Sequence, residues 1–231
     1  MNTTKISLLK RTAVVLAAGS MVLSSLVGCS MANGGTAPLV TNSVEDSEAV
    51  LTALEEADVI TAKKAAVSFG DRWKIKADGV EVGEIRGQEI YLIGDTYSLF
   101  SNSGNLVASE AEGYRVVHHR AKTYDYNNAE LGEIKQTLSF FLSEYKISNK
   151  AGETVGSAKQ KLNVALNLDV LDTDGQVDYK ISKKMISLGA DVVIENNDKN
   201  STVNAIDALW LAVIASEVQE AKSSNNNSSK S

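Results

Sequence analysis

Cys29, the only cysteine of the 231-residue chain, is the residue whose type and position best suit a defined chemical step. It follows Leu26, Val27 and Gly28, which places Leu at −3 and Gly at −1 of a candidate cleavage site, with Cys at +1. A cysteine thiol at such a site can carry a thioether-linked glyceryl group that bears acyl chains. The tetrapeptide therefore predicts cleavage between Gly28 and Cys29 and lipidation of the Cys29 sulfur.

The residues before this tetrapeptide are typical of export. Three basic residues precede the apolar, small-residue stretch 12–23, which is too short for a permanent span of about 20 apolar residues. Segment 1–28 resembles the lipobox signal of bacterial lipoproteins, and a secretory signal with an incidental Cys29 is the alternative. The resemblance implies diacylglyceryl and palmitate-type groups on Cys29. It places the protein on the extracytoplasmic side of the cell membrane, or in the outer membrane if the source has one.

Composition limits the partners of the mature chain. Residues 29–42 are mostly small, polar and uncharged, which predicts a flexible tether. Without segment 1–28 the chain has 20 basic and 29 acidic residues, a net charge of −9 that argues against nucleic acid as a partner. With Cys29 acylated, no thiol is left for a disulfide, for redox chemistry or for a thiolate metal site.

Two further groups could bind a metal, and both have simpler explanations. His118 and His119 are adjacent, so on a strand they point to opposite faces and cannot share one ion. The segment 169–175, DVLDTDG, resembles a calcium loop, but Val170 and Ile181 stand where its first and twelfth ligands belong. We expect a surface-and-core pair of histidines and a hairpin turn.

Four lysines are candidates for contact with an anionic headgroup: Lys159, Lys161, Lys183 and Lys184. Lys159 and Lys161 fall on one face of a predicted strand, and Lys183 and Lys184 end another, within the least acidic stretch of the domain, 135–184. Lysines that guard solvated strand edges are the alternative explanation. No Ser-His-Asp order, glycine-rich phosphate loop or metal motif stands out, so we expect no catalytic residue, no metal and no cofactor.

The elements that position these residues begin with a helix. Ser43 is a suitable N-cap, acidic residues fill the first turn, and apolar residues recur at helical spacing from Val50 to Ile60. The pattern predicts an amphipathic helix in segment 43–69, ended by Gly70. We expect it to pack on the following domain, and a partner-binding or spacer helix is the alternative.

From Arg72 to Glu195, short alternating runs of β-branched and aromatic residues are separated by Gly, Asn and Asp. About a dozen strands with tight connections predict an antiparallel meander that closes into a barrel or folds into a sandwich. A repeat of 24 or 25 residues, anchored at Gly83, Ala108, Gly132 and Gly156, has the length of one hairpin. The pairs at 78–79, 103–104, 127–128, 151–152 and 174–175 are expected to be its turns.

The segment 205–218, AIDALWLAVIASEV, is apolar on every face at its centre. A helix of this kind is buried or spans a membrane, and this one is too short to span. A closed barrel of about twelve strands is wide enough to surround it. We therefore expect a mainly β domain over 71–220 with a central helix at 203–220, and a disordered polar tail at 221–231.

These features resemble the tubby-like fold, and within it the LURP-one-related family. Three stretches carry the likeness: 130–162, with its Gly-x-Ile/Ala-x-Gln elements; 179–195, with Ile-Ser-Lys-Lys before a glycine turn; and the apolar helix at 205–218. Met185 departs from the aromatic residue expected after the two lysines. Tubby domains bind phosphoinositide headgroups and phospholipid scramblases share the fold, but no such binding signature matches this chain residue by residue.

The resemblance and the signal together imply a membrane-anchored, non-catalytic tubby-like lipoprotein that binds phospholipid or another envelope ligand. A structural or protein-interaction module without a small-molecule site is the alternative, and a hydrolase is a more distant one. Fold alone does not decide between them.

Overall fold

The computed structural model describes residues 43–65, 71–90, 94–112, 119–137, 143–161, 166–184 and 191–228. The chain divides into two compact units, Met1–Leu39 and Val40–Ser231, and all described residues belong to the second. The signal segment, Cys29 and the tether lie outside the described residues.

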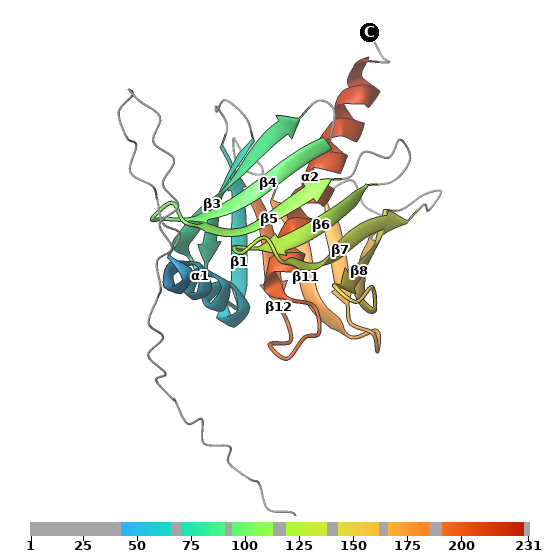
Figure 1. Ribbon diagram of the computed structural model, residues 1–231. Helices are drawn as coiled ribbons and strands as arrows, with labels where there is room; N and C mark the ends of the chain where they lie inside the picture. Colours follow the sequence, from blue (N-terminus) through green and yellow to red (C-terminus); the bar gives the residue numbers. More distant parts are fainter. Residues whose placement is uncertain are drawn as a thin grey trace, which may run out of the picture. The chain divides into compact units, whose positions relative to one another are not determined.

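The second unit is a closed antiparallel barrel in which, among the described residues, twelve strands follow one another in chain order (Figure 1). β1 lies between β2 and β12 and closes the ring. The strands are β1 (Val59–Lys64), β2 (Arg72–Ala77), β3 (Val80–Ile90), β4 (Gly94–Ser101), β5 (Leu106–Glu112), β6 (Arg120–Asp125), β7 (Glu130–Thr137), β8 (Glu144–Asn149), β9 (Thr154–Gln160), β10 (Asn167–Leu171), β11 (Val177–Lys184) and β12 (Asp191–Asn196).

Alternation of apolar and polar residues places one face of each strand inside the barrel. In β2, Trp73, Ile75 and Ala77 are buried while the residues between them are exposed. A strand turns successive side chains to opposite faces, so this period of two makes one face the core and the other the solvent. The predicted closed barrel, with a helix at its centre, is confirmed.

The 24-residue repeat corresponds to a recurring β-bulge. In β3, β5, β7, β9 and β11 the register shifts by one residue just before the anchor position. At Gly132 the neighbouring strand comes so close that a Cβ atom would lie 2.2 Å from the carbonyl oxygen of Ser148. Small residues thus accompany the bulges of β3, β5, β7 and β9, whereas β11 has Tyr179 at the equivalent position. Bulges increase the twist that a closed barrel needs.

The predicted turns are also confirmed, and together they define what we call the turn end of the barrel. Asp78 and Gly79 have φ angles of 47° and 83°, which fit a type I′ hairpin. The other four turns each contain one residue with positive φ: Gly104, Asn128, Gly152 and Gly175. The opposite end, where β1, β3, β5, β7, β9 and β11 finish, is called the mouth end.

The predicted helix at 43–69 is wrong in its length. α1 spans Val44–Glu56, and residues Val59–Lys64 form β1 instead. Val50 and Leu54 are buried on α1, whereas Ile60 and Ala62 are buried at strand spacing on β1. The apolar spacing in the sequence continues from α1 into β1 because it is compatible with a helix and with a strand. Residues 59–64 form a strand because they pair with β2 and β12.

α1 packs on the turn end, as expected for a helix that belongs to the domain. Ser43 caps it by accepting a hydrogen bond from the Asp46 amide at 3.3 Å. The Ser47 hydroxyl donates to the Leu106 carbonyl at 2.7 Å, and Asn105 donates to Asp46 at 2.6 Å. These bonds fix α1 on the turn between β4 and β5 and bury its apolar stripe.

α2 spans Ala205–Ser228 and runs through the barrel from the turn end to the mouth end (Figure 1). Every residue from Ala205 to Ser216 is buried, which makes this helix the centre of the core. The predicted disordered tail is wrong in part, because α2 continues through Ser228. Ser and Asn are weak helix formers, but extending an existing helix costs little compared with starting one.

Candidate functional site

The mouth end is the part of the barrel where charged side chains and a small pocket surround α2. Lys64, at the end of β1, points its Nζ to Glu217 Oε1 at 2.7 Å, Glu220 Oε2 at 3.0 Å and Asp71 Oδ1 at 3.0 Å. Lys183, at the end of β11, contacts Glu220 Oε1 at 2.8 Å. We call these five residues the mouth ion cluster. It links two strands of the wall to the C-terminal half of α2.

Electrostatics keep the mouth ion cluster charged. Burial lowers the pKa of Lys64, but hydrogen bonds to Glu217, Asp71 and Glu220 outweigh it and raise that pKa above its ordinary value. Burial raises the pKa of Glu217, although Lys64 offsets part of the effect. For Glu220, hydrogen bonds from Lys183 and Lys64 outweigh burial and lower the pKa. Two lysines thus face three carboxylates, and neither lysine is left to bind an external anion.

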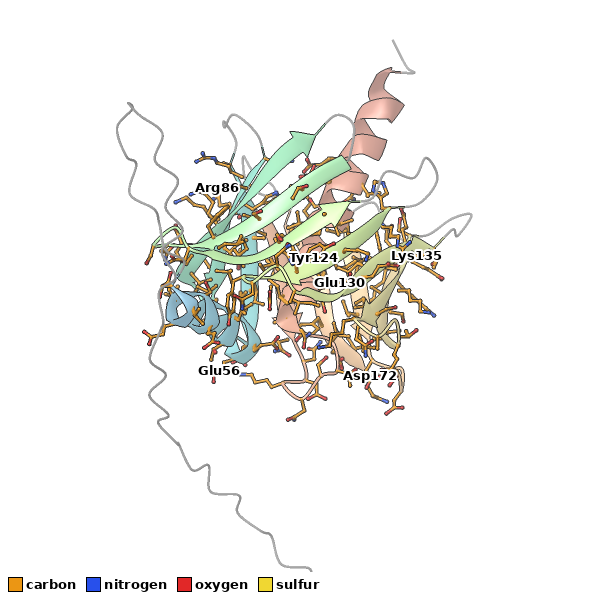
Figure 2. All side chains as sticks on the ribbon, viewed as in Figure 1. Glu56, Arg86, Tyr124, Glu130, Lys135 and Asp172 are labelled. Atoms are coloured by element: carbon orange, nitrogen blue, oxygen red, sulfur yellow. The ribbon has the colours of Figure 1, made fainter. Side chains whose placement is uncertain are left out.

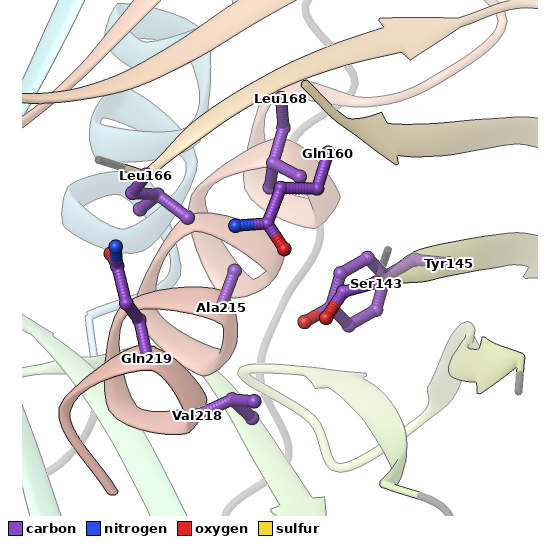
Figure 3. Close-up of a pocket in the computed structure, with 8 residues that line it drawn as sticks. All are labelled: Ser143, Tyr145, Gln160, Leu166, Leu168, Ala215, Val218 and Gln219. Atoms are coloured by element: carbon purple, nitrogen blue, oxygen red, sulfur yellow. The ribbon is translucent and has the colours of Figure 1, made fainter. Parts of the chain in front are cut away.

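A pocket of about 30 Å³ lies beside this cluster, between α2 and the strands β8 to β10 (Figure 3). A water molecule needs roughly 10–15 Å³ by this kind of measure, whereas sites for drug-sized ligands occupy roughly 300–1,000 Å³. The pocket therefore suits water rather than an acyl chain or a substrate. Its lining is Ser143, Tyr145, Gln160, Leu166, Leu168, Ala215, Val218 and Gln219.

At the turn end, polar groups hold the beginning of α2. Glu55 of α1 accepts a hydrogen bond from the Ala205 amide at 2.8 Å, and the Thr123 hydroxyl donates to Asp207 at 3.2 Å. Burial raises the pKa of Asp207 to about 6, although the bond from Thr123 opposes the shift. The Tyr179 hydroxyl donates to the Val203 carbonyl at 3.1 Å. These contacts give acceptors to the helix start and fix the segment that leads into it.

The structure separates the four lysines named as headgroup contacts. Lys159 and Lys161 are exposed on the outer wall, and the Lys161 Nζ lies 2.9 Å from Asp169. Lys183 instead points inward to α2, with its side chain only 17% exposed. Lys184 ends β11, and its side chain is outside the described set. The four lysines therefore do not form one patch, and a closed barrel has no strand edge for them to guard.

Other candidate groups have structural roles or lie outside the described residues. Asp172 accepts hydrogen bonds from the amides of Asp174 and Gln176, both at 2.8 Å, so the expected hairpin turn is confirmed (Figure 2). His119 is exposed, while His118, Gly28 and Cys29 are outside the described residues. In the described ranges no group of three acidic, histidine or cysteine residues could hold a metal ion.

Sequence reasoning missed the mouth ion cluster. The predicted helix 43–69 includes Lys64 and the predicted helix 205–218 includes Glu217, and neither residue is a candidate for a site on sequence grounds. A signal existed in the spacing of Glu217 and Glu220, which puts both carboxylates on one face of α2. Their lysine partners are more than 30 residues away in sequence, so no local pattern could identify them.

No helix in the described part of the chain has the length and hydropathy that crossing a membrane requires. This finding concerns the helices alone.

Comparison with known proteins supports the fold. No protein-family model and no curated protein sequence matches the chain. Among solved structures, the chain is similar to the X-ray structure of an Arabidopsis thaliana protein that is LURP-one-related, with a TM-score of 0.50 and 14% identity. The match covers 73% of this chain and 97% of that one. At this identity the likeness shows the fold alone, and that fold is the tubby-like barrel which the sequence predicted.

Proposed function

We propose that this chain is a lipid-anchored, extracytoplasmic lipoprotein whose barrel is a non-catalytic module that contacts the membrane or another envelope component through its outer surface. One observation carries the choice of surface over interior: α2 fills the barrel, and the pocket beside it measures only about 30 Å³. The sequence Leu26-Val27-Gly28-Cys29 supports the anchor.

The proposal assigns attachment and recognition to different parts of the chain. Two or three acyl chains on Cys29 supply the multiple anchors that stable attachment needs. The barrel domain, with its large excess of acidic residues, gains little from an anionic membrane as a whole. Recognition then falls to a local surface of the barrel, with phospholipid headgroups as the first candidate partner.

Expression of the full chain in a bacterium tests the anchor. We expect a mature protein that begins at Cys29 and carries the mass of diacylglyceryl and acyl groups. It should partition into the detergent phase and float with vesicles. The Cys29→Ser variant should lose the added mass, the detergent partition and the flotation. The Ser30→Ala variant, changed one residue away, should keep all three. A mature chain with a free thiol at Cys29 would contradict the proposal.

A second measurement tests the filled interior. A fluorescent fatty acid added to the Cys29→Ser chain should show no saturable binding, because the described pocket is too small for an acyl chain. Saturable binding with a stoichiometry near one would show an internal ligand site and would contradict the assignment of recognition to the outer surface.

A further inference from the structure

Charge is distributed unequally between the two ends of the barrel. The segments that build the turn end contain 14 acidic and only 2 basic residues: 43–58, 77–81, 101–105, 125–130, 149–154, 171–177 and 196–204. The rest of the mature chain contains 18 basic and 15 acidic residues. The excess negative charge of the domain is therefore concentrated at one end, and the remainder is weakly positive.

Basic residues are exposed on the wall toward the mouth end. Lys135 of β7 and Lys146 of β8 are directly opposite each other in the antiparallel register, and both are exposed. Figure 2 shows Lys135 pointing away from the barrel. In the described residues neither has a carboxylate within 4 Å, whereas Arg120 and Lys122 nearby are paired with Glu133 and Glu130. Like charges in direct opposition destabilise a sheet, so this pair favours an anion outside the protein.

The connections between strands at the mouth end add little negative charge: in their described residues the one acidic side chain is that of Asp71, which is paired with Lys64. The sequence has no acidic residue in the parts of these six connections that lie outside the described residues: 66–70, 91–93, 113–118, 138–142, 162–165 and 185–190. The domain therefore has a negative pole at the turn end, and its remainder is weakly positive, with the exposed pair Lys135 and Lys146 on the wall toward the mouth end. Such a charge distribution turns a tethered molecule in the potential of a charged surface.

We propose that an anionic phospholipid bilayer orients the tethered barrel with its mouth end toward the lipid and its turn end away from it. The inference rests on the proposed lipid anchor and names the surface that faces the membrane. The surface potential attracts Lys135 and Lys146 and repels the acidic turn end, and it acts within about one Debye length, roughly 8 Å at physiological salt.

The length of the tether permits this orientation although α1 begins at the turn end. Residues 29–42 number 14, and a chain of that length spans at most about 50 Å. A strand of eight residues such as β7 covers roughly 26 Å. The tether can therefore run the full length of the wall, and the membrane can meet the end farther from the attachment point.

Energy transfer to a lipid acceptor tests the orientation. Because Cys29 is acylated, an introduced cysteine is the only thiol that a fluorophore can label. Asn167→Cys marks the mouth end of β10 and Thr173→Cys marks the exposed turn after it, about 20 Å away by strand rise. On vesicles of phosphatidylglycerol, we expect transfer on the order of twofold stronger from position 167. On phosphatidylcholine, or in 1 M salt, the difference should disappear.

Charge variants provide the matched control. The double variant Lys135→Glu and Lys146→Glu should abolish the difference between the two labels. Lys76→Glu together with Lys150→Glu changes the net charge equally, but both residues are exposed near the turn end, so this variant should keep the difference. Equal transfer from both labels on phosphatidylglycerol, or stronger transfer from position 173, overturns the proposal.

The same labels on the unacylated Cys29→Ser chain are measured at 10 mM salt, where the Debye length is about 30 Å. The stronger transfer from position 167 should persist in these transient encounters. Finding Cys29 unacylated in the natural chain would overturn the proposed function. The energy-transfer measurement on the Cys29→Ser chain would still decide the orientation of the barrel.

Discussion

The two ends of the barrel hold the same helix by different means. At the turn end α2 begins, so its first amides need acceptors, and the carboxylate of Glu55 bonds one of them; no lysine or arginine among the described residues pairs with Glu55. At the mouth end α2 passes through with its backbone already bonded, and its glutamates need cations, which Lys64 and Lys183 supply. The start of α2 thus supplies amides that a carboxylate can accept from, whereas the glutamates farther along the helix are paired with lysines.

The largest effect on stability is expected where the apolar side of α1 packs on the core. Leu54 is completely buried against the core, so Leu54→Ala should lower the free energy of unfolding by about 2–5 kcal/mol. Thr52→Ala, at an exposed position of the same helix, should change it by less than about 0.5 kcal/mol. Urea denaturation followed by circular dichroism measures both. Equal changes in the free energy of unfolding would show that the packing of Leu54 on the core does not stabilise the domain.

The next effect concerns the mouth end. Lys64→Met keeps the apolar stem but removes the charge shared by Glu217, Glu220 and Asp71. Because the cluster is partly exposed, we expect a loss of about 1–3 kcal/mol, below the range for a fully buried pair. The loss should shrink at acidic pH, where Glu217 takes up a proton. Lys74→Met breaks the exposed pair with Glu81 and should cost almost nothing.

Asp207 should make the turn end sensitive to pH. Its pKa in the folded protein is raised from 3.8 to about 6, so the unfolded chain loses this proton at lower pH than the folded one. The free energy of unfolding should therefore fall as pH rises from 4 to 6 and level off above. Asp207→Asn keeps an acceptor for Thr123 and should gain about 1–3 kcal/mol at pH 7. A variant with no gain at pH 7 relative to pH 4 would contradict this account.

The smallest effect is expected beyond the mouth. Residues 223–231 follow the last buried positions of α2 and are mainly Ser and Asn. Their deletion should change the melting temperature by less than about 2 °C, because serine and asparagine are weak helix formers and add little stability at a helix end. A larger fall in melting temperature would show that residues 223–231 also stabilise the mouth end, in addition to the cluster of Lys64 and Lys183.

The strands and turns could be predicted because their signals are local. Alternation in β2 and the Asp78-Gly79 turn each depend on a few neighbouring residues. β1 could not be predicted, since its residues continue the stripe of α1. Its pairing with β2 and with β12, which is more than 130 residues away, shows it to be a strand. Likewise Lys64 and Glu217 are 153 residues apart, so their contact appears only after the barrel has closed.

Ring closure by β1 and β12 also constrains how the chain reaches its native state. Each hairpin from β2 to β12 can form between near neighbours, but Val59 must find Glu195 near the other end of the domain. Contacts of such sequence separation are slow to form, because the loop entropy is lost before the contact is gained. Until β12 is available, the growing sheet has two unpaired borders and no enclosed helix. We therefore expect the joining of the first strand to the last to be a late step in folding.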